Sequence, residues 1–195
     1  MTFAACATSD RLRAPTAGEM GAVDLATRGL LAELGYFGSV TRCRVGLAVN
    51  DVAERSIEVA APVSPEHCVI VYATTGVLEL SPTDLRALFA HGLAHLRLPQ
   101  ATPGRRVTTS TGRGGAVRFT LPRSYTDDEE AAADREAVGL LERVAPGGAG
   151  CRTLADVLDR VSSEGARWSA WTDQHAMTAG RPTALRALCD ARPAR

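Results

Sequence analysis

The sequence of 195 residues contains no lysine, no C-x-x-C pair and no long apolar run, and each absence narrows what the protein can be. All 22 basic residues are arginines and they balance 22 acidic residues, so no general attraction to nucleic acid or to an anionic membrane follows. No stretch approaches the ~20 apolar residues that a membrane-spanning helix needs. We therefore expect a protein with no membrane span and no nucleic-acid partner.

Five cysteines are present, and they are scattered singly along the chain. An odd, unclustered set argues against a disulfide framework and for buried or inert thiols in a reducing compartment. The N-terminus has no basic segment followed by an apolar one, so it is not typical of a secretory signal. The cysteine pattern and the N-terminus together predict a cytoplasmic protein.

The composition, 45% hydrophobic and 23% charged, is typical of a globular protein, and the chain is long enough for one domain. Residues 1–17 are small and polar, so we expect a flexible N-terminal arm followed by a single domain at 18–195. Apolar residues recur at helical spacing over 20–34 and stop at Gly35, which suits a helix end. Three β-branched runs then predict strands of an antiparallel sheet, at 44–49, 56–59 and 68–72.

Two later helices begin with strong capping signals. Ser81 suits an N-cap and Pro82 the first turn of a helix that ends before Pro99. A capping box at 126–129 begins a second helix, which reaches about residue 144. Strands followed by helices indicate an α+β fold. Two further helices are expected near 153–163 and 183–190.

These two capped helices carry the residues that point to chemistry. His91 and His95 are four residues apart, so both imidazoles project from one face of the first helix and suit a tetrahedral zinc ion that needs at least one more ligand. Glu130 and Asp134 have the same spacing on the second helix. One carboxylate can complete the site, and the other can orient a histidine. The alternatives are two histidines satisfied on a half-exposed face and a solvated acidic helix start.

Residues 68–95 and 130–135 resemble the HtpX and CAAX-prenyl endopeptidase family of zinc metallopeptidases. That family has a strand, then a helix bearing His-Glu-x-x-His, then a helix with Glu-x-x-Ala-Asp-Arg, to which the Glu-Ala-Ala-Ala-Asp-Arg at 130–135 is similar. The resemblance implies a zincin-like metallopeptidase domain, with a small antiparallel sheet packed on a metal-binding helix pair. It also implies zinc held by His91, His95 and Glu130, with Asp134 behind the ligands.

Two departures from the family pattern concern catalysis. Gly92 occupies the position of the family's catalytic glutamate, a general base of a kind worth typically ~10²–10⁴-fold in rate. Arg181 occupies the position of the family's C-terminal histidine. A glycine inside a helix costs about 1 kcal/mol relative to alanine. We expect the missing side chain to open space beside the metal for a substrate or ligand, with neutral drift as the alternative.

The sequence therefore predicts a zinc-binding protein of metallopeptidase fold that lacks the usual general base. We expect a repurposed or weak metal-dependent hydrolase acting on a peptide or small molecule. The alternative is an inactive pseudo-peptidase that binds a peptide or protein partner. Fe2+ is the alternative metal, since two histidines and one carboxylate also suit iron. A bound peptide would pair with a strand near the metal, and the candidate residues for this are Val69, Ile70, Val71 and Tyr72.

Overall fold

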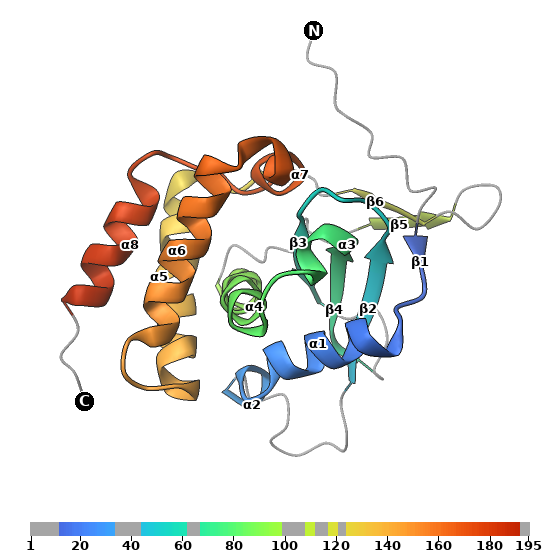
Figure 1. The fold of residues 1–195 in the computed structure, drawn as a ribbon, viewed down its shortest axis with the longest axis horizontal. Coiled ribbons are helices and arrows are strands. Elements are labelled where there is room, and N and C mark those ends of the chain that lie inside the picture. The colour runs from blue at the N-terminus through green and yellow to red at the C-terminus, as the bar shows by residue number, and fades with distance from the viewer. Residues whose placement is uncertain are drawn as a thin grey trace, which may run out of the picture.

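The computed structural model describes residues 12–33, 44–61, 67–98, 108–111, 117–120 and 124–191. A small sheet lies on one side of the molecule and a group of helices on the other, with helix α4 (Pro82–Arg97) between them (Figure 1). The fold is therefore mixed α+β, as predicted. Within the described residues, no helix has both the length and the apolar character that crossing a membrane requires.

The main sheet has four strands in the order β1-β2-β4-β3. Strands β2 and β4 are parallel, whereas β1 pairs with β2 and β3 pairs with β4 in antiparallel fashion. The prediction of strands in these three runs is confirmed, but the prediction of a wholly antiparallel sheet is wrong. After β2 the chain crosses to β3 at the far edge of the sheet. It then returns as β4, which lies between β2 and β3. The strands are β1 (Leu12–Arg13), β2 (Arg44–Asn50), β3 (Ile57–Ala60) and β4 (His67–Thr74).

The central position of β4 follows from its sequence. Residues 68–73 form an almost continuous apolar run, which is typical of a strand buried on both faces. Both backbone edges of β4 are used, because Val71 pairs with Leu47 of β2 and with Val59 of β3. The prediction that Val69–Tyr72 accepts an added peptide strand is therefore wrong, since β3 is the edge strand on that side of the sheet.

The capping predictions for the two key helices are confirmed. The side chain of Ser81 accepts a hydrogen bond from the backbone N–H of Asp84 at the start of α4. Helix α5 (Asp127–Val144) begins with a capping box in which Thr126 and Glu129 satisfy each other's backbone N–H groups. Both starts are local, so the sequence alone determines them.

The N-terminal part departs from its prediction in two ways. The expected helix over 20–34 is two helices, α1 (Ala17–Thr27) and α2 (Leu30–Glu33), separated by Gly29 at a positive φ of 85°. Its expected end at Gly35 lies outside the described residues. The arm expected over 1–17 is not wholly loose, because residues 12–13 form β1 and Thr16 caps α1.

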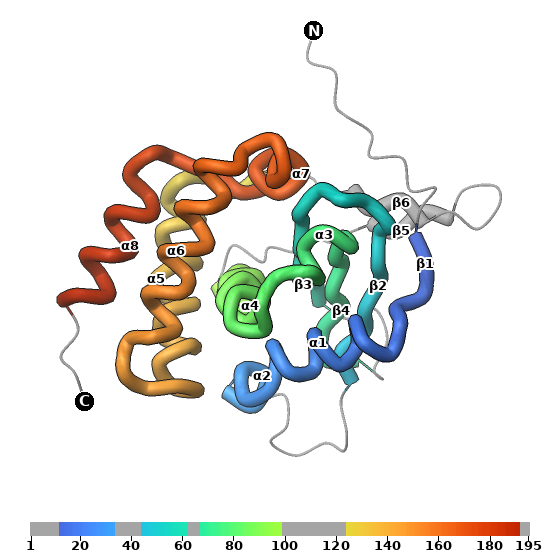
Figure 2. The backbone as a smooth tube through the Cα atoms, in the orientation of Figure 1, coloured from blue at the N-terminus to red at the C-terminus, as the bar shows by residue number. Residues whose placement is uncertain are grey.

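The remaining elements of the described residues are helices and one two-stranded sheet. Figure 2 shows the path of the tube through α5 and α6 to α7 and then along α8, which lies at the outer side of the helical group. The elements are α3 (Thr75–Leu78), β5 (Thr108–Thr111), β6 (Val117–Thr120), α6 (Ala149–Ser163), η1 (Gly165–Trp168), α7 (Ser169–Thr172) and α8 (Arg181–Asp190).

Helix α4 is the centre of the core. It packs against α1, α5, α6 and β3 and is therefore enclosed on several sides. Its apolar residues are buried, including Leu85, Leu88, Phe89 and Leu93. This position also buries His91 and His95, the two histidines of the helix.

A disulfide joins Cys151 of α6 to Cys189 of α8. Cys68 is also disulfide-bonded. The expectation of inert thiols is therefore wrong for these cysteines. Sequence separation hid the pairing of Cys151 with Cys189, which are 38 residues apart and meet only because α8 packs along α6.

Candidate metal centre

The two histidines of α4 form the first half of the site. Their Nε2 atoms lie 3.1 Å apart, and His91 and His95 are only 1% and 3% exposed. The four-residue spacing thus places both imidazoles at one point, as predicted. The ring of Tyr125, from the segment before α5, stacks on His95 with ring centroids 3.7 Å apart.

Glu130 supplies the third donor from the first turns of α5. Its Oε2 lies 3.1 Å from Nε2 of His91, and its Oε1 lies 3.6 Å from Nε2 of His95. Helix α5 packs directly on α4, and Glu130 is 1% exposed. The structure therefore brings together the three residues that the sequence analysis proposed as ligands.

His175 is a fourth donor that the sequence analysis missed. Its Nδ1 lies 2.9 Å from Oε1 of Glu130 and 3.4 Å from Nε2 of His91. Trp171 stacks on its ring with centroids 4.2 Å apart. His175 follows α7 in an irregular segment, so no helical spacing relates it to the other donors. Its position in the sequence, six residues before Arg181, was the one available signal.

The spacing of the four donors suits a tetrahedral metal ion. Donor atoms about 2.0–2.1 Å from a zinc ion lie about 3.3–3.4 Å from one another. The five contacts among the four side chains span 2.9 to 3.6 Å, and all donor atoms lie within 4.8 Å of one another. The buried Oε2 of Glu130 receives no well-aligned hydrogen bond in the described part of the chain, although Nη2 of Arg181 lies 2.7 Å from it. These features fit a cation placed among the donors.

Carboxylates hold two of the imidazoles from behind. Oδ1 of Asp134 lies 3.0 Å from Nδ1 of His91, although the contact is poorly aligned for a hydrogen bond. Oε1 of Glu58, on the edge strand β3, lies 3.0 Å from Nε2 of His175. When His175 is neutral, donation of its Nε2–H to Glu58 would leave the lone pair of Nδ1 facing the other donors. Such carboxylate–histidine pairs fix the tautomer and the ring orientation of metal ligands.

Arg181 lies beside the donors rather than among them. Its guanidinium group donates two hydrogen bonds to Asp134, of 2.7 and 2.8 Å, and its Nη2 lies 2.7 Å from Oε2 of Glu130. Its Nη1 donates to the backbone carbonyl of Ala176, just after His175. Arg181 thus pairs with the donor Glu130 and with Asp134 behind His91, and its bond to Ala176 holds the segment that carries the fourth donor.

The charges of this cluster balance when a divalent cation is present. With neutral histidines, Glu58, Glu130 and Asp134 carry three negative charges and Arg181 carries one positive charge, which leaves two negative charges on side chains that are mostly buried. Buried charges without partners are strongly destabilising. A divalent ion with neutral histidines brings the sum to zero.

Without a metal, the same carboxylates act on the histidines. Burial opposes protonation of His175, but Glu58 and Glu130 outweigh it and raise its pKa to about 9. Burial lowers the pKa of His95 to about 4. Burial alone would raise the pKa of Glu130, but hydrogen bonds from His175 and His91 hold it well below its usual range. The donors thus include an ionised carboxylate and a neutral imidazole, which are the protonation states that bind metals.

Gly92 does not open space beside the site. A Cβ on residue 92 would lie 2.5 Å from Cγ2 and 3.0 Å from Cβ of Val59. The expectation of room for a substrate is therefore wrong, because β3 fills the space that a side chain would occupy. Close packing between the strand and the helix is the physical reason for the glycine.

No family model matches the chain, and no curated protein matches it.

Proposed function

We propose that this protein binds zinc at a closed centre of four protein ligands and does not hydrolyse peptides. The observation that carries the proposal is the convergence of four buried donors, His91, His95, Glu130 and His175. Closed four-ligand sites are typical of structural zinc, whereas catalytic sites keep one position open for water or substrate. In this arrangement His175 takes the position that catalysis requires to be open.

Three further points support this proposal. The resemblance to the HtpX and CAAX-prenyl endopeptidase family favours zinc and a zincin-like origin. Gly92 provides no proton acceptor, and general-base help is worth typically ~10²–10⁴-fold. Iron sites of the two-histidine, one-carboxylate type keep open positions, so a closed centre favours zinc over Fe2+.

The Cys151–Cys189 bridge favours an oxidising compartment over the cytoplasm that the cysteine pattern indicated.

Metal analysis of the purified protein tests the proposal. We expect about one zinc per chain in the wild type and strong loss of zinc in both His95→Ala and His175→Ala. His67→Ala is the matched control, because His67 lies on β4 outside the donor cluster, and it should retain zinc. A wild-type protein purified without chelators and free of metal would contradict the proposal.

The second candidate function is a weak zinc-dependent hydrolase, and the Glu58–His175 pair favours it. A histidine hydrogen-bonded to a carboxylate can accept a proton, so the pair can replace the missing glutamate if His175 does not bind the ion. The two functions differ in one variant. A hydrolase of this kind loses peptide cleavage in His175→Ala but keeps its zinc, whereas the closed centre loses zinc and shows no cleavage at the outset.

As a zinc-stabilised module, the protein would act by binding a peptide or protein partner. Strand β3, rather than β4, is then the candidate for pairing with a partner strand. Glu58 on β3 contacts His175 directly, so this edge and the metal centre are physically connected.

A further inference from the structure

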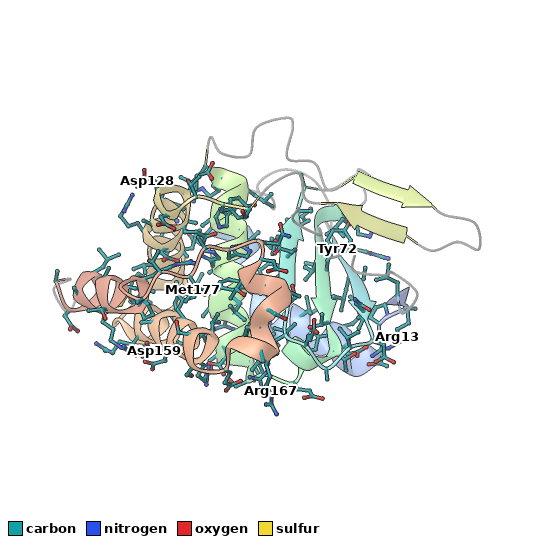
Figure 3. The ribbon with its side chains drawn as sticks, turned by 90° about the horizontal axis from the view of Figure 1, so that it is seen from above. Arg13, Tyr72, Asp128, Asp159, Arg167 and Met177 are labelled. Carbon is teal, nitrogen blue, oxygen red and sulfur yellow. A yellow bond between two sulfur atoms is a disulfide. The ribbon has the colours of Figure 1, made fainter. Side chains whose placement is uncertain are left out.

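A pocket of about 440 Å³ lies between the first half of α5, the segment 176–180 and α8. Apolar side chains, including Ala131, Ala184 and Leu185, form part of its wall. Asp127 and Asp128 line it as well and are exposed. Figure 3 shows Asp128 at the outer end of α5.

The pocket reaches the metal centre at two residues. Glu130 lines the pocket and is also a donor of the centre. Arg181 lines the pocket, and its Nη2 lies 2.7 Å from Oε2 of Glu130 and 3.4 Å from Nε2 of His91. Arg181 is therefore both a lining residue of the pocket and, through its guanidinium group, a neighbour of two donor atoms.

The charges along this path differ between its outer and inner parts. Asp127 and Asp128 form no ion pair within the described residues, and the exposed Arg135 also lines the pocket, so its exposed lining has two carboxylates and one guanidinium group. Arg181 is 7% exposed, and its guanidinium group forms ion pairs with Asp134 and Glu130. The outer part attracts a cation, while the inner part presents a positive group to it.

We propose that this pocket is the route by which the divalent ion reaches and leaves the centre, with Arg181 as its gate. The proposal rests on the proposed function, because it requires that the centre binds a metal. The guanidinium group moves off Glu130 while the ion passes and returns to it afterwards. Asp127 and Asp128 raise the local concentration of the ion at the outer end.

A route has a kinetic signature that a ligand does not have. A change that only narrows the route leaves the free energies of the metal-free and metal-bound proteins unaltered. It therefore slows association and dissociation by the same factor, and the dissociation constant stays the same. Loss of a ligand raises the dissociation constant.

Two exposed alanines on α8 provide a matched pair for the experiment. Ala184 lines the pocket and Ala187, one turn further along, does not. Stopped-flow mixing of metal-free protein with Zn2+ gives the association rate, and transfer of zinc to an excess of a chromogenic chelator gives the dissociation rate. In Ala184→Phe both rates should fall by at least about threefold, with an unchanged dissociation constant. Ala187→Phe should match the wild type in both rates.

The rim is tested separately by Asp127→Asn combined with Asp128→Asn. Association should slow by about tenfold at low salt and the difference should shrink as salt is added, because steering by exposed charges is screened. The Arg181→Lys variant keeps a positive charge at this position but loses the two parallel hydrogen bonds that the guanidinium group donates to Asp134. It should speed dissociation while zinc stoichiometry stays at one per chain.

The outcomes separate this proposal from the proposed function. A protein that binds no zinc overturns the proposed function and the route with it. A protein that binds one zinc but shows wild-type rates in Ala184→Phe and in the double aspartate variant overturns the route alone. A folded Arg181→Lys variant that binds one zinc and releases it at the wild-type rate overturns the role of Arg181 as the gate.

Discussion

Val59 of β3 occupies the space that any side chain on Gly92 of α4 would need, with its Cγ2 atom 2.5 Å from the position of a Cβ. The strand therefore lies closer to the helix than a larger residue permits. The glycine is a packing requirement of this molecule, whatever residue stood there in an ancestral protein.

Gly92→Ala should destabilise the protein by ~1–3 kcal/mol, because the added methyl group overpacks the contact with Val59. In an unobstructed helix the same change is stabilising by about 1 kcal/mol. Gly139→Ala on α5 is the control, since its Cβ would meet only the flexible end of Arg143 at 3.4 Å. Urea denaturation measures both. A stabilised Gly92→Ala variant would show that β3 does not press on α4.

The cost at position 92 should depend on residue 59. In a Val59→Ala background, Gly92→Ala should become neutral or stabilising, which gives a coupling of ~0.5–3 kcal/mol between the two positions. A double-mutant cycle from four unfolding curves measures this coupling. Simple additivity of the two changes would rule out the contact as the cause.

Zinc binding should release a proton from His175. Its pKa is raised to about 9 in the metal-free protein, so the imidazole is protonated at pH 7 and has to lose that proton to donate a lone pair. Affinity should rise by about tenfold per pH unit up to about pH 9 and then level off. Calorimetry in two buffers of different ionisation enthalpy counts the protons. Equal heats in both buffers at pH 7 would contradict the prediction.

The same pKa of His175 makes the stability of the metal-free protein depend on pH. The folded pKa of His175 lies above its unfolded value of about 6.5, so its stabilising contribution is fully present below that value. It is lost as the pH rises through about 9. The free energy of unfolding, measured in the presence of a chelator, should therefore decrease between pH 7 and pH 9. The variant His175→Gln should lack that part of the pH dependence.

Glu58→Gln should weaken zinc binding by ~10–100-fold, the usual effect of losing the partner behind a metal-bound histidine. The amide keeps the size of the carboxylate but removes the charge that fixes Nε2–H of His175, 3.0 Å away. Glu54→Gln is the control, because Glu54 is exposed in the loop before β3. Competition with a chelator of known affinity measures both. Equal affinities would place Glu58 outside the metal centre.

Removing the disulfide should cost about 3–4 kcal/mol, as expected for a closed loop of this length. The loop spans a sequence separation of 38 residues between Cys151 and Cys189. The double serine variant tests this by denaturation, and thiol titration of the unfolded wild type establishes that the bond is present. Unchanged stability would mean that α8 is held to α6 by its other contacts alone.

The sequence predicts most of the site where local rules apply. Ser81 and Thr126 begin two helices through short-range hydrogen bonds, and the four-residue spacings then place His91 with His95 and Glu130 near Asp134. These features need only the geometry of one helix at a time.

The sequence fails where tertiary packing decides. His175 approaches the other donors through an irregular segment, and no period in the sequence marks it. The space beside Gly92 depends on Val59, a residue of another element. Arg181 was assigned by resemblance to a histidine position, and the structure instead pairs it with Asp134 and Glu130.

The Cys151–Cys189 bond closes a ring of chain that contains both His175 and Arg181, whereas the other three donors lie before it. A protease that cuts the backbone once between residues 152 and 188 therefore releases no fragment from the oxidised protein. The two new ends stay joined through the sulfur atoms, and His175 remains attached to the molecule that carries the other donors. In a reduced chain, a cut between residues 152 and 175 would separate His175 from the other three donors.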